Sequence, residues 1–273
     1  MRSCAIINHI PSSIDIIIIS SLPEAFFREE LCRPFSLIPG KLDCGCLQTD
    51  SENTDIKGTL SQYSKLHDNR EVLCSRFTHI LEKKAVNLVF SDIVPMAFPI
   101  ARRLGVSAYG VANFNWADIY FPYLKHCPWF KPVYEQILKD YSLADGYLSM
   151  EPGMAGTGFI KRSKVGLVAR QGQNKRSLIA KTFRIDPDKK WCLVYLGCYG
   201  MGAIDWSKLS QYSHWEFFGL YDLQCSIPNY HRVAVDKTLG YADLTASCEI
   251  VLGKLGYGLV SESLVFQKPV LFF

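Results

Sequence analysis

Residues 249–273, EIVLGKLGYGLVSESLVFQKPVLFF, constrain the fold more than any other stretch of the chain. They predict an apolar strand over residues 250–252, a glycine-rich turn, a helix over residues 259–266 and a second strand that begins after Pro269. Glycine lets backbone N–H groups approach a ligand closely, and the helix directs its positive end to the same point. The unit therefore suits a phosphate or diphosphate, although a turn of this kind is about as often only a tight connection.

The residues around this turn narrow the chemistry. Glu262 lies about one helical turn into the predicted helix, where a carboxylate can accept hydrogen bonds from sugar hydroxyls. A Walker A loop is excluded, because it needs Lys followed by Ser or Thr at the start of the helix. Here Lys254 lies early in the loop and is followed by Leu255. The sequence therefore does not indicate an ATPase.

Length and composition indicate a folded protein of two domains. The chain has 273 residues, which exceeds an ordinary single domain, and 48% of them are hydrophobic. The formal charge of +4 is small and no dense run of Lys and Arg occurs, so we expect no nucleic-acid partner.

The spacing of the cysteines indicates whether the chain binds a metal, and the length of its apolar runs indicates whether it crosses a membrane or is secreted. Ten cysteines occur, but they fall singly except for Cys44 and Cys46, and neither a CxxC motif nor a paired Cys/His spacing is present. We therefore expect reduced thiols, no metal site and a cytoplasmic protein. The apolar run over residues 16–19 is too short to cross a bilayer, and Asp15 interrupts any signal-peptide pattern.

The first half of the chain alternates helices and strands, with an irregular stretch over residues 22–53 that predicts surface loops and at most a short strand. The predicted elements are the tail of a helix (residues 3–10), a fully buried strand (14–21), one long helix (58–84), a buried strand (87–91), a helix (96–104), a strand (107–111), a helix (131–144) and a short strand (146–149).

Polar side chains follow two of these predicted strands. Asp92 comes just after the strand over residues 87–91, and Asn113 and Trp116 follow the next one. In an open α/β sheet, ligands bind at the carboxyl ends of the strands, so these residues predict one edge of a cleft. For Asp92, capping of the next helix is an alternative role, and the two roles are compatible.

The second half repeats this order after a turn-rich junction, EPGMAGTG, at residues 151–158. Lys161, Arg162 and Lys164 are expected to be a solvated basic rim. The later predicted elements are a helix (174–183), a strand (191–196) that ends in a glycine-rich loop (197–202), two strands (214–220 and 230–235) and a short helix (241–247). The chain is thus predicted to form two Rossmann-like α/β domains, residues 1–155 and residues 156–273.

Five segments, spread over most of the chain and kept in order, resemble the GT-B glycosyltransferases. The closest pattern is that of the glycosyltransferase-like region at the N-terminus of plant L-arabinokinases. The segments are SDIVPMAFPIARRLG (residues 91–105), VANFNWADIY (111–120), VGLVAR (165–170), LGCYGMG (196–202) and YADLTASCEIVLGKLGYGLVSESL (241–264).

The resemblance implies that a nucleotide diphosphate sugar binds to the second domain as the donor substrate, with no cofactor and no metal. Its sugar would pass to an acceptor hydroxyl bound by the first domain, where Asn113 and Trp116 line the acceptor side and Asp92 is catalytic. Leu259 departs from the pattern, since related sequences often have Thr there. The implied donor-binding residues are Gly197, Tyr199, Gly200, Lys254, Gly256, Tyr257, Gly258, Ser261 and Glu262.

In plant-type inverting members of this fold, an aspartate in a position similar to that of Asp92 orients a histidine that deprotonates the acceptor. That histidine is expected in a loop ahead of the first helix, which this sequence does not contain, and His9 lies at the wrong end of the helix. Related chains also continue beyond residue 273. We therefore expect both domains to be incomplete, as in a chain truncated at both ends. The alternative function is a non-catalytic nucleotide-sugar-binding or regulatory module of the same fold.

Overall fold

The computed structural model describes residues 2–49, 53–196, 204–223 and 225–272. The chain divides into two units that are both discontinuous in sequence. We call them the central unit, which contains Ile17–Pro23 and Phe35–Leu167, and the C-terminal unit, which contains Met1–Ile16, Glu24–Pro34 and Val168–Phe273.

This division differs from the predicted one in two respects. The boundary lies after residue 167 rather than after residue 155, and two N-terminal segments belong to the C-terminal unit. Side-chain hydrogen bonds hold these segments together: the Asn8 amide donates to the carbonyl of Glu30 and accepts from the N–H of Cys32, both at 2.9 Å, and the Arg33 guanidinium donates to the carbonyls of Ile10 and Ile14. No local pattern in the sequence predicts hydrogen bonds between residues so far apart in the chain.

The N-terminal segments form two short helices. These are α1 (Arg2–Ile7), as the sequence predicts, and α2 (Glu24–Glu30), which lies in the stretch where loops were predicted. A side-chain contact joins them to the later chain, because Gln171 Nε2 lies 3.0 Å from His9 Nε2.

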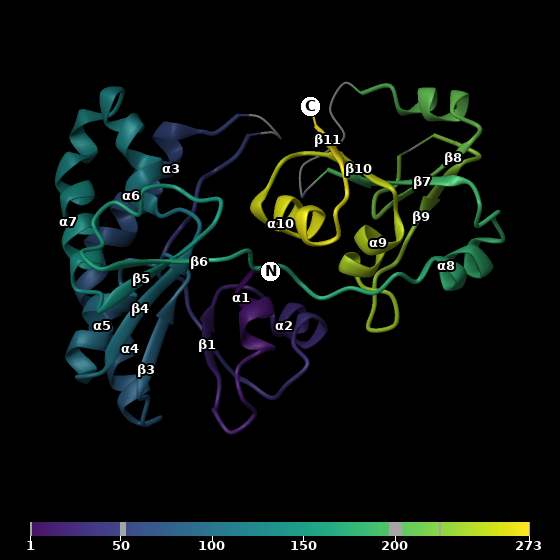
Figure 1. The fold of residues 1–273 in the computed structure, drawn as a ribbon. Coiled ribbons are helices and arrows are strands. Elements are labelled where there is room, and N and C mark those ends of the chain that lie inside the picture. Colours follow the sequence, from purple (N-terminus) through teal and green to yellow (C-terminus); the bar gives the residue numbers. More distant parts are fainter. Residues whose placement is uncertain (1, 50–52, 197–203, 224, 273) are drawn as a thin grey trace. The chain divides into compact units, whose positions relative to one another are not determined.

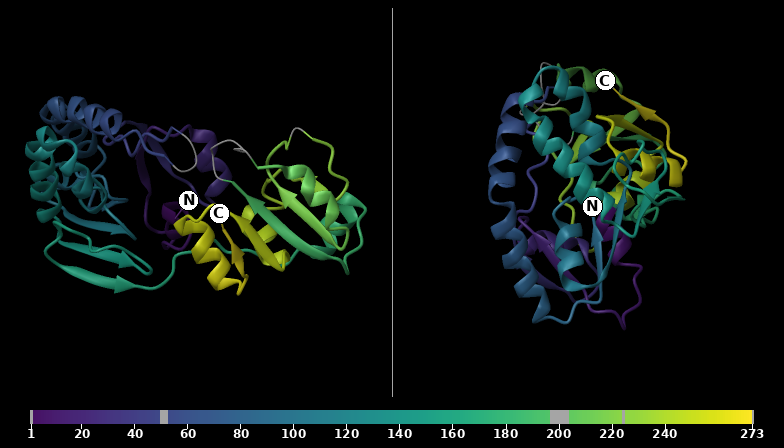
Figure 2. Two further views of the ribbon diagram at one scale, coloured as in Figure 1. Left: turned by 90° about the horizontal axis from the view of Figure 1, so that it is seen from above. Right: turned by 90° about the vertical axis from the view of Figure 1, so that its left-hand side faces the viewer.

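The central unit is built on a parallel sheet with strand order β3-β4-β5-β6, and its helices gather on one side of that sheet (Figures 1 and 2). Its strands are β3 (Leu88–Ser91), β4 (Ser107–Ala112), β5 (Gly146–Met150) and β6 (Arg162–Val165). Its helices are α3 (Ile56–Asp68), α4 (Arg70–Glu82), α5 (Ala97–Leu104), α6 (Trp116–Tyr120) and α7 (Lys131–Ser142).

A separate pair of parallel strands completes this unit. β1 (Ile17–Ser20) pairs with β2 (Ser36–Pro39) in register. Ile17 and Ile19 pack with Phe77 of α4 and Ile100 of α5, and α5 also contacts β3 and β4, so α5 supports both this pair and the larger sheet.

Two predictions for the central unit are wrong, and a third is confirmed with an addition. The helix predicted over residues 58–84 is two helices, which meet at Asn69. Lys161, Arg162 and Lys164 are exposed, as predicted for a solvated basic rim, and Arg162 and Lys164 also belong to the edge strand β6, where exposed charge disfavours pairing with another chain. The strands predicted to be fully buried are covered by helices on one face only, so β1 is half-buried, and Leu88 and Phe90 of β3 are 45% and 53% exposed.

The C-terminal unit contains a parallel sheet of order β11-β10-β7-β8-β9, whose two faces both carry buried side chains. Trp191, Leu193 and Val251 pack with the helices, and Cys192 and Val194 pack with Trp206 and Leu209 on the other face. Burial on both faces explains the continuous apolar runs in the sequence. The strands are β7 (Lys190–Tyr195), β8 (Trp215–Gly219), β9 (Tyr230–Arg232), β10 (Ile250–Gly253) and β11 (Val270–Leu271), and the helices are α8 (Arg176–Phe183), α9 (Tyr241–Ser247) and α10 (Tyr257–Val265).

Asp243 fastens the segment before α8 to the start of α9. Its Oδ1 accepts from the N–H of Gln173 at 2.8 Å, and its Oδ2 accepts from Lys175 Nζ at 2.7 Å and from the N–H of Gly240 at 2.9 Å. Burial alone would raise the pKa of Asp243, but these hydrogen bonds lower it below its ordinary value of 3.8.

We predict a pH-dependent loss of stability from this carboxylate. Because its folded-state pKa lies below its unfolded value, its contribution is complete above about pH 4 and is lost as the pH falls through the folded-state pKa. Asp243→Asn should lower the urea midpoint at pH 7, and the difference from the wild type should shrink below pH 4. The exposed Asp188→Asn serves as the control. A difference that stays constant from pH 7 to pH 3 would contradict this role.

Candidate functional site

The turn between β10 and α10 has the predicted geometry. β10 ends at Gly253, the N–H of Lys254 donates to the carbonyl of Tyr195 at 3.0 Å, and Gly256 is the exposed residue before the first turn of α10. Gly256 is extended (φ −146°), and a Cβ placed on it would meet no atom within 4 Å. The backbone at the start of α10 is therefore open to a ligand.

Two of the predicted donor-binding side chains already have partners inside the C-terminal unit. The Tyr257 hydroxyl accepts from the N–H of Val168 at 3.0 Å, and the buried Ser261 hydroxyl donates to the carbonyl of Gly258 at 3.1 Å. Tyr257 therefore also fixes the start of the segment that leads to α8. Donor contacts by these residues stay predictions.

Glu262 is buried and paired with a cation. Its Oε1 lies 2.7 Å from Arg170 Nε, and its Oε2 lies 3.4 Å from Arg170 Nη2. The Glu262 side chain is 3% exposed. Burial raises the pKa of Glu262 above its ordinary value, the Arg170 guanidinium opposes that change, and the charge of Glu30 adds to it.

Three other predicted donor-binding residues, Gly197, Tyr199 and Gly200, lie outside the described residues. The part of the site that the structure describes is thus the β10–α10 turn, Glu262 and the residues that hold Glu262.

On the central unit, Asp92 and Asn113 follow the neighbouring parallel strands β3 and β4, so both lie at one edge of the sheet, as predicted. The backbone after Asp92 is strained: Ile93 is β-branched and has φ +62°. Such a conformation costs about 1–3 kcal/mol. The Tyr141 hydroxyl donates to the carbonyl of Ile93 at 2.7 Å and accepts from the N–H of Trp116 at 3.2 Å. One buried tyrosine therefore holds the turn that carries Asp92.

Asp43 is a residue at this edge that the sequence analysis missed. Its Oδ2 accepts from Trp116 Nε1 at 2.8 Å, and Trp116 stacks on Tyr120 with ring centroids 5.4 Å apart. Burial raises the pKa of Asp43, the Trp116 hydrogen bond opposes that change, and the charge of Asp92 raises the pKa further. Asp43 and Asp92 thus interact electrostatically. Asp43 lies in the stretch predicted as surface loops, so no periodicity could have placed it beside Trp116.

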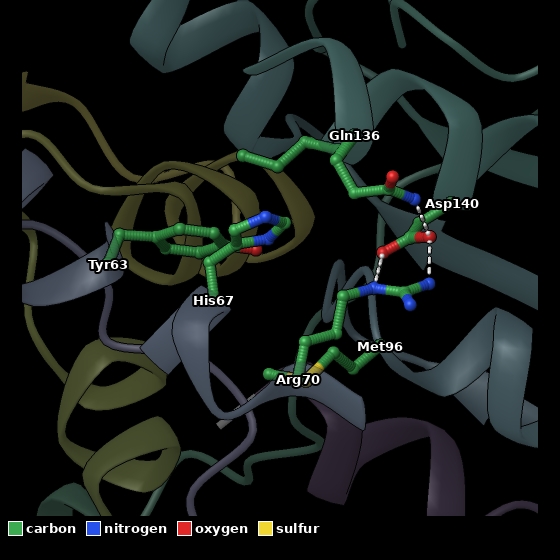
Figure 3. A pocket seen from close by; sticks show the side chains of 7 residues that line it. Tyr63, His67, Arg70, Met96, Gln136 and Asp140 are labelled. Carbon is green, nitrogen blue, oxygen red and sulfur yellow. Dashed lines mark hydrogen bonds and ion pairs between the residues drawn. The ribbon is translucent and has the colours of Figure 1, made fainter. Parts of the chain in front are cut away.

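A small polar pocket lies elsewhere in the central unit (Figure 3). It has room for about one water molecule (about 10 Å³). Arg70 faces Asp140 across it, with Nε–Oδ2 at 3.1 Å and Nη2–Oδ1 at 2.5 Å, and Gln136 Nε2 donates to Asp140 Oδ1 at 2.9 Å. The remaining lining residues are Tyr63, His67, Met96 and Ile137. The pairing satisfies the buried Asp140 and stabilises the packing of α4 against α7.

The described residues form neither a metal-binding cluster nor a membrane-spanning helix. No group of three or more His, Cys, Asp or Glu side chains there is placed to hold a metal ion. No helix formed by these residues is both long enough and apolar enough to span a bilayer.

Both ring nitrogens of His9 have neighbours: Nδ1 lies 2.8 Å from the carbonyl oxygen of Ala5, and Nε2 lies 3.0 Å from Gln171 Nε2.

The chain is similar in sequence to a plant protein. It is 26% identical over 280 residues to the L-arabinokinase of Arabidopsis thaliana, a match that covers 99% of this chain. The chain spans only 26% of the length of that relative. No protein-family model matches the chain.

Several solved structures of glycosyltransferases have a similar fold. The calicheamicin glycosyltransferase CalG4 superposes with a TM-score of 0.64 at 13% identity, over 98% of this chain and 74% of that chain. UGT2 of Phytolacca americana without ligand gives 0.62 at 12% identity, over 99% and 77%. The same UGT2 complexed with UDP-2-fluoro-glucose and pterostilbene gives 0.56 at 15% identity, over 95% and 73%. The chain therefore has the GT-B glycosyltransferase fold, and it is similar in sequence to part of a plant L-arabinokinase.

Proposed function

We propose that this chain binds a nucleoside diphosphate sugar in its C-terminal unit and transfers the sugar to an acceptor hydroxyl. The observation that carries the proposal is the β10–Gly256–α10 turn, at the carboxyl edge of a parallel sheet, with the Glu262 carboxylate one turn into the helix. Backbone N–H groups at the start of α10 bind the diphosphate, and the helix dipole favours its negative charge.

The fold supports this assignment, since CalG4 is a glycosyltransferase and UGT2 was solved with a UDP-sugar analogue and pterostilbene. In the reaction, the acceptor oxygen loses its proton to a base and forms a bond to the anomeric carbon of the sugar. The bond from that carbon to the diphosphate breaks, and the nucleoside diphosphate leaves. Asp92 is the catalytic carboxylate that we assign to the acceptor side, with Asn113 and Trp116 at the same edge of the sheet.

Calorimetry with UDP-, GDP- and dTDP-sugars tests the donor site. We expect at least one donor to bind the wild type and Glu262→Ala to bind it at least about tenfold more weakly, because a hydrogen bond to a charged group contributes about 1.5–3 kcal/mol. Glu135→Ala on the surface of α7 is the control and should bind as the wild type does. A folded wild-type sample that binds none of these donors would remove the donor-site claim.

Turnover is a separate measurement. Release of nucleoside diphosphate that depends on an added acceptor hydroxyl supports transfer. Donor binding without turnover for every acceptor offered would instead indicate a nucleotide-sugar-binding module of the same fold.

A further inference from the structure

Arg170 lies at the centre of a buried charge cluster in the C-terminal unit. Its guanidinium contacts both Glu262 oxygens, and its Nη1 lies 3.2 Å from Oε1 of Glu30 on α2. Its Cζ lies 5.2 Å from the ring centroid of Tyr241 on α9. The Arg170 side chain is 16% exposed. Its planar fork thus joins the segment before α8 to α2, α9 and α10, which a lysine ammonium could not do in the same geometry.

The cluster holds two carboxylates and one cation. Glu262 and Glu30 are 3% and 21% exposed, so neither charge is well hydrated. The side chains that face Glu262 are Arg170 from the preceding segment, Glu30 from α2 and Tyr241 from α9. Without Arg170, the buried Glu262 would face a second carboxylate and no cation, and its pKa would be raised further.

The cluster also has unused hydrogen-bonding capacity. A carboxylate offers about four lone-pair sites, and Arg170 contacts Glu262 through its guanidinium on both oxygens and through its backbone N–H, which still leaves acceptor capacity for a donor hydroxyl. The Tyr241 hydroxyl, in a residue 8% exposed, has no hydrogen-bond partner among the described residues. A buried hydroxyl without a partner is uncommon, and a polar ligand that enters the cluster would satisfy it.

We propose that Arg170 is the positioning residue of the donor site: it holds the Glu262 carboxylate in place for the hydroxyls of the nucleotide sugar and, through Glu30, ties α2 to the same site. This inference rests on the proposed function, since it assigns Glu262 to the donor. Arg170 does not itself touch the reacting atoms. It fixes the charge state and the orientation of the group that contacts the donor.

The test compares four variants with the wild type by calorimetry, with UDP-glucose, GDP-mannose and dTDP-glucose as probes and circular dichroism as the check on folding. Arg170→Lys keeps the charge and loses the fork, and it should weaken donor binding at least about tenfold. Glu29→Gln is the control: it removes an exposed charge on the same helix α2, outside the cluster, and it should stay within about threefold of the wild type.

Arg170→Met separates positioning from a structural role. If Arg170 only stabilised the fold, this substitution would not change the pH dependence of donor binding. The donor affinity of Arg170→Met should rise with pH as Glu262 loses its proton, and that rise should lie at higher pH than any rise in the wild type, because the variant lacks the cation that opposes the raised pKa of Glu262. Adding Glu262→Gln to this variant should abolish the pH dependence. Arg170→Gln, which also lacks the charge, replaces the methionine variant if that one does not fold.

Each outcome decides the inference. If the wild type binds a donor and both Arg170→Lys and Arg170→Met bind it with unchanged affinity, the positioning role is overturned and the proposed function stands. The same conclusion follows if the Arg170→Met variant loses affinity by the same factor at every pH. Failure of the folded wild type to bind all three probes would overturn the proposed function and this inference with it.

Discussion

Gly253→Ala will disrupt the sheet of the C-terminal unit, with a loss of more than about 3 kcal/mol in the free energy of unfolding. Gly253 is buried and paired with Tyr195 of β7, and a Cβ at this position would lie 1.9 Å from the Tyr195 carbonyl oxygen. No side chain can rotate to relieve that overlap, because the obstacle is backbone. The strands β10 and β7 must therefore separate, and the turn that leads to α10 starts from the end of β10.

Hydrogen exchange measures this effect with an internal control. Amides of β7 and β10 should lose protection in Gly253→Ala, whereas amides of β4 and β5 in the central unit should keep theirs. The matched variant is Gly256→Ala, whose Cβ meets no atom and whose backbone is extended. It should unfold within about 0.5 kcal/mol of the wild type, so that weaker donor binding reports on ligand approach alone. Native protection of β7 and β10 in Gly253→Ala would contradict the close approach of the two strands.

Asp140→Ala is the second substitution with a large expected effect. It removes the counter-ion of Arg70, whose side chain is 19% exposed, and it also removes the acceptor for Gln136. Breaking a buried pair costs about 3–5 kcal/mol; because Arg70, the charge left behind, is only partly buried, we expect a loss toward the lower end of that range and a clear fall in the urea midpoint of the central unit. Equilibrium urea unfolding followed by circular dichroism measures the change.

Two further variants separate this pair from ordinary surface charge. Glu71→Ala breaks an ion pair with Arg103 in which the Glu71 side chain is 72% exposed, and it should leave the midpoint nearly unchanged. Arg70→Met with Asp140→Leu should recover most of the lost stability, because an apolar pair needs no counter-charge. If Asp140→Ala matches the wild type, Arg70 is satisfied by solvent and the pair does not stabilise the unit.

Sequence pattern was sufficient for the elements whose side chains repeat locally. The strand, turn and helix over residues 250–265 were placed correctly, because apolar runs and glycines report on residues that are close in the chain. The edge with Asp92 and Asn113 followed from the parallel order of β3 and β4. The break at Asn69 was missed, since apolar spacing continues through both helices and the change of direction depends on tertiary packing.

The partners of the site residues could not be read from the sequence. Arg170 and Glu262 are 92 residues apart, and Asp43 and Trp116 are 73 apart. Neither pair leaves a periodic signal in the sequence, because a side-chain hydrogen bond between distant residues depends on only one residue in each of the two segments that it joins. The donor role of Glu262 was inferred from its place on a helix, whereas its burial and its cation became visible only in three dimensions.

The first 34 residues alternate between the two units: residues 1–16 and 24–34 belong to the C-terminal unit, and residues 17–23 belong to the central unit. The protein therefore cannot be divided into two independent fragments by a single cut. An expression fragment that starts at Val168 would contain Arg170 and Glu262 but not Glu30, Asn8 or the carbonyls that Arg33 engages. A cut at residue 155 would separate α1 and α2 from the rest of the C-terminal unit, to which they belong. Recombinant halves should therefore be made as linked chains that supply residues 1–16 and 24–34 to the C-terminal unit and leave residues 17–23 with the central unit.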